Sequence, residues 1–195
     1  MKLKSLLLLW IFMSGPSLGL AQDVEEEVRS FMTQRDQEIK DAVRGMKTDP
    51  SLREVARSLI NDQIDFEEMG KRSLGRYYED LTPEERQEFI EVFGGIVRSQ
   101  SLGDLSVYEA PVSIESVAIN GDQATVNTTA EIREDELDVV YHLHRKEESW
   151  WLYDIVIDGV GTVEGYSVSF QTFLRKRGFE AFMQSLRKKL AATED

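Results

Sequence analysis

His142 and His144 are the side chains best suited to proton transfer or metal binding in this sequence, which contains only two histidines. Residues two apart in an extended strand point to the same face, so the two imidazoles should lie side by side. The apolar residues Tyr141 and Leu143 would then occupy the opposite, buried face. We interpret the histidines as solvated or partly covered, with metal binding and catalysis as alternatives.

Two aspartates, Asp154 and Asp158, belong to the apolar segment that follows the histidines, and they could take part in acid–base chemistry. A carboxylate on a sheet can act as a general base, as in isomerases and dehydratases. It can equally be a hydrogen-bonded group that holds a loop or an arginine, and we prefer this interpretation. An isomerase or dehydratase that uses Asp154 or His142 is therefore the alternative function.

Other catalytic motifs do not occur in the chain. It has no cysteine, which excludes thiol nucleophiles, disulfides, zinc fingers and cysteine-ligated iron–sulfur clusters. It lacks a Gly-x-Ser-x-Gly motif and a P-loop, and Gly159-Val160-Gly161 lacks the third glycine of a dinucleotide fingerprint. We interpret those glycines as a turn at a strand end, and we expect a protein without cofactor, metal or catalytic activity.

Composition and charge exclude a further class of function and indicate the number of domains. The 195 residues include 23 Lys and Arg against 36 Asp and Glu, a formal net charge of −13. Such an acidic chain does not carry the basic footprint of a nucleic-acid-binding protein. Its apolar and charged fractions are typical of a folded domain, and its length fits one domain.

The first 21 residues have the pattern of a secretory signal peptide. Lys2 and Lys4 precede a short apolar run, Leu6–Met13, and Gly19-Leu20-Ala21 supplies the small residues of a cleavage site. The apolar run is too short to span a bilayer as a helix. We predict cleavage after Ala21 and an exported single domain over residues 22–195, for which a bacterial periplasm is a suitable compartment.

The spacing of the hydrophobic residues divides that domain into three parts. Residues 22–101 have the three-and-four spacing of helices, and Thr82 to Glu85 form a capping box with proline at the first helical position. Gly94-Gly95 weakens this helix, which suggests that another segment packs closely against it. Residues 165–190 return to helical spacing, interrupted at Gly178.

Between these helical parts, residues 105–158 alternate with a period of two. Asn120-Gly121-Asp122 predicts a tight hairpin turn, and four strands follow one another along the chain. The fourth strand, 150–157, is apolar on both faces and must be covered on both sides. The sequence therefore predicts an α+β fold in which helices pack on a four-stranded antiparallel curved sheet.

The chain is also rich in large flexible or aromatic side chains, with nine Phe, six Tyr and six Met. These residues could simply fill the core. Alternatively, helices laid over a curved sheet leave a wedge-shaped space that such residues line as a ligand pocket. Composition alone favours the filled core.

The order of several motifs favours the pocket. The stretches 65–78 and 81–89, the run 150–160 that begins with Trp150-Trp151, and the helix–glycine–helix segment 170–186 occur in this order after a signal peptide. Together they resemble the MlaC family, also called the toluene-tolerance family, of periplasmic auxiliary proteins of ABC transporters. The resemblance covers most of the chain from Asp65 to Leu186.

The resemblance implies a specific fold, ligand and set of partners. Family members have a fold of the nuclear-transport-factor-2 type, whose added helices enclose an apolar pocket for phospholipid tails. They carry phospholipid between an outer-membrane lipoprotein complex and an inner-membrane complex of an MCE protein with an ABC transporter. From their size and expected position we take seven pocket candidates: Phe93, Val97, Val139, Tyr141, Val163, Tyr166 and Phe170.

This chain departs from the family pattern at Gly161, where a serine is usual, and at Gly165-Tyr166-Ser167. We therefore carry over the tail pocket and not the headgroup contacts.

The cost of exposing acyl tails to water also favours a carrier, because each exposed methylene costs about 0.8 kcal/mol. The acidic surface should dock on basic patches of membrane complexes. A third possibility is a protein-binding module whose exposed apolar surface is an interface.

Overall fold

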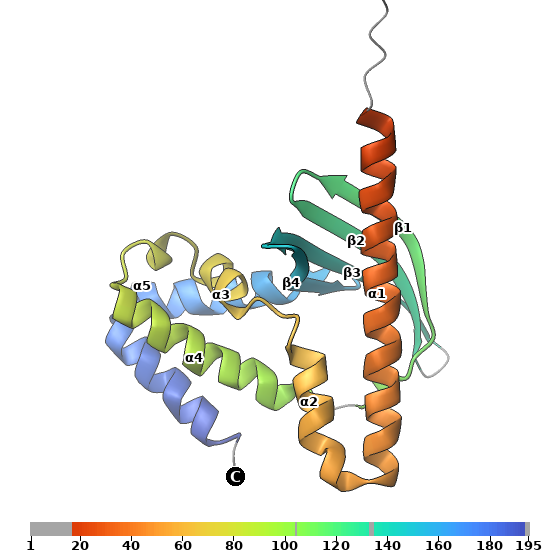
Figure 1. The fold of residues 1–195 in the computed structure, drawn as a ribbon. Coiled ribbons are helices and arrows are strands. Elements are labelled where there is room, and N and C mark those ends of the chain that lie inside the picture. The colour runs from red at the N-terminus through yellow and green to blue at the C-terminus, as the bar shows by residue number, and fades with distance from the viewer. Residues whose placement is uncertain (1–16, 104, 133–134, 194–195) are drawn as a thin grey trace, which may run out of the picture.

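The computed structural model describes residues 17–103, 105–132 and 135–193 and has helices packed on an antiparallel sheet (Figure 1). Most of the predicted signal peptide, residues 1–16, lies outside the described residues. Residues 17–21 form the first turn of helix α1. Cleavage after Ala21 therefore stays a prediction.

Helix α1 (Ser17–Thr48) crosses in front of the sheet in Figure 1. It ends at Thr48, and Asp49 then begins the 3-10 helix η1 (Pro50–Leu52) by accepting a hydrogen bond from the Ser51 N–H. Helix α2 (Arg53–Asn61) follows and packs back against α1. These two helices form one side of the molecule.

Helices α3 (Phe66–Leu74), α4 (Pro83–Gln100) and α5 (Thr162–Ala191) form the other side, with the 3-10 helix η2 (Gly75–Tyr78) between the first two. The predicted capping box is confirmed: the Thr82 hydroxyl accepts from the Glu85 N–H at 3.2 Å, and the Glu85 carboxylate accepts from the Thr82 N–H at 2.9 Å. The predicted close packing at Gly94-Gly95 is also confirmed, because a Cβ on Gly94 would lie 3.3 Å from Phe66.

The predicted break at Gly178 is a kink inside α5. Gly178 has φ 74° and ψ 175°, a conformation available to glycine and strained for other residues. The two halves of α5 therefore pack in different directions, and Figure 1 shows the chain turning back alongside α4.

The sheet has strand order β1-β2-β3-β4-β5, with all neighbours antiparallel. The four predicted strands are confirmed as β1 (Val112–Asn120), β2 (Gln123–Ile132), β3 (Asp135–Lys146) and β4 (Ser149–Ile157). The sheet begins later than residue 105, because Leu105–Tyr108 is the 3-10 helix η3.

A fifth strand, β5 (Val160–Gly161), corrects the predicted strand count. Of the three residues interpreted as a turn at a strand end, Gly159 lies in the turn, and Val160 and Gly161 lie in the strand. Asp158 and Gly159 both have positive φ and reverse the chain tightly. Val160 and Gly161 then pair with Ile157 and Val156 of β4. A two-residue strand has too little alternation to be recognised from the sequence.

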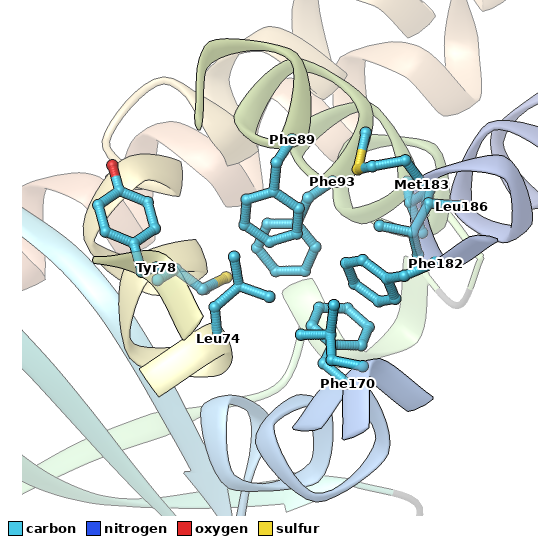
Figure 2. Packing of buried hydrophobic residues seen from close by; sticks show 11 residues of the cluster. Leu74, Tyr78, Phe89, Phe93, Phe170, Phe182, Met183 and Leu186 are labelled. Atoms are coloured by element: carbon cyan, nitrogen blue, oxygen red, sulfur yellow. The ribbon is translucent and has the colours of Figure 1, made fainter. Parts of the chain in front are cut away.

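An aromatic cluster joins α3, α4 and α5 (Figure 2). The rings of Phe89 and Phe93 stack with centroids 5.4 Å apart, and Phe170 meets Phe93 edge-on at 5.7 Å. Phe182, from the second half of α5, meets Phe170 at 5.0 Å. The three helices therefore have a hydrophobic core of their own, beside the sheet.

A second core attaches α1 to the sheet. Val28 is fully buried against Leu143 and Trp150 from β3 and β4. At the surface above this contact, the Glu27 carboxylate accepts hydrogen bonds from Trp150 Nε1 at 3.0 Å and from Arg145 at 2.6 Å. The first half of α1 is thus fixed across the sheet.

Candidate functional site

A cavity of about 600 Å³ lies between these two cores. The middle of α1 forms one wall and the inward face of the sheet forms another. The remaining lining residues come from η3, the end of α2, the end of α4 and the start of α5. Helix α1 contacts β1, whereas α3 and α5 contact β4, and the cavity lies between α1 and these two helices.

The cavity wall is mostly apolar. Helix α1 contributes Phe31 and Met32 on one turn and Ile39 two turns further on. Lining residues alternate on β1 and β3, as the pleat requires, whereas a register shift in the pairing of β3 with β4 lets residues three apart on β4 line the cavity. The apolar lining residues of the sheet are Val112 and Ile114 of β1, Tyr141 and Leu143 of β3, and Leu152 and Ile155 of β4.

The charged side chains at the wall are already paired with neighbours. The Arg29 guanidinium contacts Glu25 at 3.1 Å and donates to the Ile114 carbonyl at 3.2 Å. Lys40 lies 2.6 Å from the Asp36 carboxylate.

Arg35 is paired in the same way, with Glu38 at 2.7 Å and also with Asp62. Each charge at the wall is thus compensated within the protein, and the cavity does not need a charged ligand to neutralise it.

Three tyrosines place hydroxyl groups at the wall: Tyr108 of η3, Tyr141 of β3 and Tyr166 of α5. Burial raises the pKa of Tyr108 to about 12, with a smaller contribution from Tyr141. Burial also raises the pKa of Tyr141, helped by the nearby Asp36 carboxylate, and burial raises that of Tyr166. All three hydroxyls are therefore neutral at pH 7 and can donate hydrogen bonds.

The seven pocket candidates are divided between the cavity and its surroundings. Val97, Tyr141 and Tyr166 line the cavity. Phe93 and Phe170 belong to the aromatic cluster behind it, and Val163 packs against the same cluster. Val139 is buried on β3 outside the lining.

The residues that sequence reasoning missed come mainly from α1 and η3. Phe31, Met32 and Ile39 belong to an apolar stripe within the helical spacing of residues 22–101. The stripe does face inward, but part of it faces the cavity. Its spacing is the same for a filled core and for a pocket wall, so the sequence carried no signal to separate them.

The residues considered for catalysis lie away from the cavity. His142 and His144 point to the other face of the sheet, where His142 stacks on Tyr153 with ring centroids 6.0 Å apart. Asp154 accepts a hydrogen bond from the Val163 N–H at 2.9 Å and so holds the start of α5, which confirms the preferred interpretation.

Asp158 likewise serves the backbone, accepting from the Asp138 N–H at 3.1 Å. Within residues 17–193, apart from 104 and 133–134, no cluster of three or more His, Asp or Glu side chains is arranged to hold a metal ion.

The sequence model of the MlaC protein family matches residues 23–188. The chain belongs to the MlaC family. The match begins just after the predicted cleavage site and extends from α1 into α5, so the family assignment made from the motifs is confirmed.

Two proteins similar to this MlaC-family chain can be compared with it. The MlaC binding protein of an intermembrane phospholipid transport system in Haemophilus influenzae is 25% identical over 151 residues, which cover 73% of this chain and 71% of the relative. A phospholipid-binding protein of Ralstonia solanacearum, solved in complex with a phospholipid, superimposes with a TM-score of 0.68 at 21% identity.

That comparison covers 83% of this chain and 98% of the Ralstonia chain, and it confirms the mixed fold of helices on an antiparallel sheet. Among the helices in the described part of this MlaC-family chain, none combines the length and apolarity needed to cross a membrane.

Proposed function

We propose that this protein is a periplasmic phospholipid carrier that holds acyl tails in the cavity between α1 and the sheet. The carrier would move lipid between an outer-membrane lipoprotein complex and an inner-membrane complex of an MCE protein with an ABC transporter. The cavity carries this proposal, because a mostly apolar space of about 600 Å³ is available to a ligand in the middle of the fold.

The energetics of lipid transfer explain why such a cavity is needed. Exposing an acyl chain of about sixteen carbons to water costs on the order of 12 kcal/mol. A wall of Phe, Met, Ile and Leu side chains removes that cost while the lipid is away from a bilayer. The cavity also lies within the size range of about 300–1,000 Å³ that is usual for ligand pockets.

The relatives support the choice of ligand. The Haemophilus protein is named for phospholipid transport, and the Ralstonia structure contains a phospholipid. Both match this chain over most of its length. We extend the ligand class to this chain on the basis of its family membership and its own cavity.

Native mass spectrometry of the freshly purified protein tests the proposal. We expect a bound mass that disappears on delipidation, and extraction should identify it as phospholipid. Protein that carries no lipid when purified, and takes up none from mixed micelles, would contradict the proposal.

A pair of substitutions localises the ligand. Ile39→Asp places a carboxylate in the cavity wall and should abolish most lipid occupancy, because a buried charge without a partner is strongly unfavourable next to acyl tails. Val55→Asp makes the same change on α2 at a side chain that is 52% exposed, and should leave occupancy unchanged. Circular dichroism checks that both variants are folded.

The acidic surface suggests how the carrier would dock. The net charge of −13 favours basic patches on the membrane complexes and disfavours anionic bilayers. Raising the salt concentration should therefore weaken binding to the purified inner-membrane complex, as screening predicts. Binding that is insensitive to salt would reject this docking mode.

A further inference from the structure

The cavity wall contains a chemical feature that acyl tails alone do not require. Tyr108, Tyr141 and Tyr166 all reach the cavity, and within the part of the chain that the structure describes no hydrogen bond from their hydroxyls is made. Acyl tails in the cavity would exclude water from these partly buried hydroxyls, and a hydroxyl that then lacks a partner is unfavourable. A wall meant only for hydrocarbon would be better served by phenylalanine.

Two of these tyrosines are neighbours from different elements. Tyr108 lies on η3 and Tyr141 in the middle of β3, both line the same cavity, and Tyr141 contributes to the raised pKa of Tyr108. Because both hydroxyls stay protonated, they can act as donors at every physiological pH. They form a pair of donors in a wall that is mostly apolar.

The surroundings of the pair indicate which acceptor it fits. A phosphate would be drawn to a free cation, but the arginines of the wall, Arg29 and Arg35, are already engaged with acidic neighbours. Lys40 is engaged in the same way, with the Asp36 carboxylate near Tyr141. A neutral acceptor is therefore favoured over a charged one.

The neutral acceptors of a glycerophospholipid next to its tails are the ester carbonyl oxygens. We propose that Tyr108 and Tyr141 form a subsite that donates hydrogen bonds to the ester carbonyls of the bound lipid. The subsite selects ester-linked over ether-linked lipids and fixes how deeply the lipid enters. This inference rests on the proposed carrier function and specifies its ligand.

A competition between two lipids tests it. Delipidated protein is mixed with equimolar diester and diether phosphatidylcholine of equal chain length in detergent micelles, and the two complexes are counted by native mass spectrometry. The wild type should favour the diester lipid. Each of Tyr108→Phe and Tyr141→Phe should reduce that preference about fivefold, the value of one neutral hydrogen bond.

The matched control is Tyr153→Phe. Tyr153 is a buried tyrosine of β4 that packs on His142 at the opposite face of the sheet, away from the cavity. This variant should keep the wild-type preference.

A second measurement separates ligand binding from a structural role. The delipidated double variant should melt at or above the wild-type temperature, because neither hydroxyl makes a hydrogen bond to the described part of the protein. If the hydroxyls support the fold instead, the double variant should melt lower.

Equal binding of diester and diether lipid by the wild type would overturn the subsite while leaving the carrier function intact. An undiminished preference in the double variant, or a lowered melting temperature, would overturn it too. Failure of either lipid to bind would overturn both the subsite and the carrier function.

Discussion

The carboxylate of Asp65, just before α3, accepts a hydrogen bond from Lys146 Nζ at the end of β3, at 3.0 Å. His144 Nε2 lies 3.1 Å from the same oxygen, while the other carboxylate oxygen accepts from the Glu68 N–H and caps α3. Asp65 is only 5% exposed. This single side chain therefore fixes the start of the three-helix side to the sheet.

Asp65→Asn should lower stability in a pH-dependent way. Burial alone would raise the pKa of Asp65, but the Glu68 N–H and Lys146 outweigh it and hold that pKa below its usual value. The ionised carboxylate thus stabilises the fold above about pH 4, and this contribution is lost as the pH falls through the lowered folded-state pKa. Urea unfolding of this variant should show a free energy of unfolding about 1–2 kcal/mol lower at pH 7. The free energy of unfolding should also depend less on pH in the acidic range.

Glu67→Gln is the control for this effect. Glu67 lies 3.9 Å from the same Lys146 ammonium, but its side chain is 64% exposed. Such a surface pair contributes little, so the loss should stay below about 0.5 kcal/mol. Equal losses in the two variants would mean that Asp65 has no special role.

Features set by local sequence were the ones that could be predicted. The capping box at Thr82, the hairpin turn at Gly121 and the kink at Gly178 each depend on a few consecutive residues, and the structure contains all three. Strand alternation also gave four strands in the right order. The two-residue strand β5 could not be found in this way, because it exists only through its pairing with β4.

The cavity depends on contacts that sequence periodicity does not reveal. Phe93 and Phe31 both lie on apolar helical stripes, yet Phe93 is buried in the aromatic cluster and Phe31 lines the cavity. Which of them faces open space is decided by where α1 sits on the sheet. That position is set by groups as far apart as Glu27 and Trp150, 123 residues away.

Glu27→Ala should loosen α1 from the sheet. The change removes the acceptor for Trp150 Nε1 and for Arg145. Because the Glu27 side chain is 41% exposed, the expected loss of unfolding free energy is modest, about 1 kcal/mol. Chemical denaturation measures it, and Glu26→Ala, the neighbouring exposed glutamate, should have no measurable effect.

The dependence of the unfolding free energy on pH above about pH 10 tests the burial of Tyr108. Its pKa in the folded state is raised to about 12, above the ordinary value of 10.0. The contribution to stability is therefore complete below about pH 10 and is lost as the pH rises towards 12, by about 1.4 kcal/mol for each pH unit. Tyr108→Phe should remove this dependence on pH. If the variant and the wild type lose stability equally at alkaline pH, Tyr108 is exposed to solvent.

The kink in α5 provides a test of the geometry that lets both halves of this helix reach the aromatic cluster. Gly178→Ala forces an L-residue to φ 74° and should cost about 1–2 kcal/mol of unfolding free energy. Gly165→Ala is the control in the same helix, because Gly165 has ordinary helical geometry and open space within 4 Å of its Cβ position. It should raise stability by about 0.5–1 kcal/mol. If both substitutions stabilise the protein, α5 is a straight helix in solution, and Phe170 and Phe182 cannot both keep their places in the cluster.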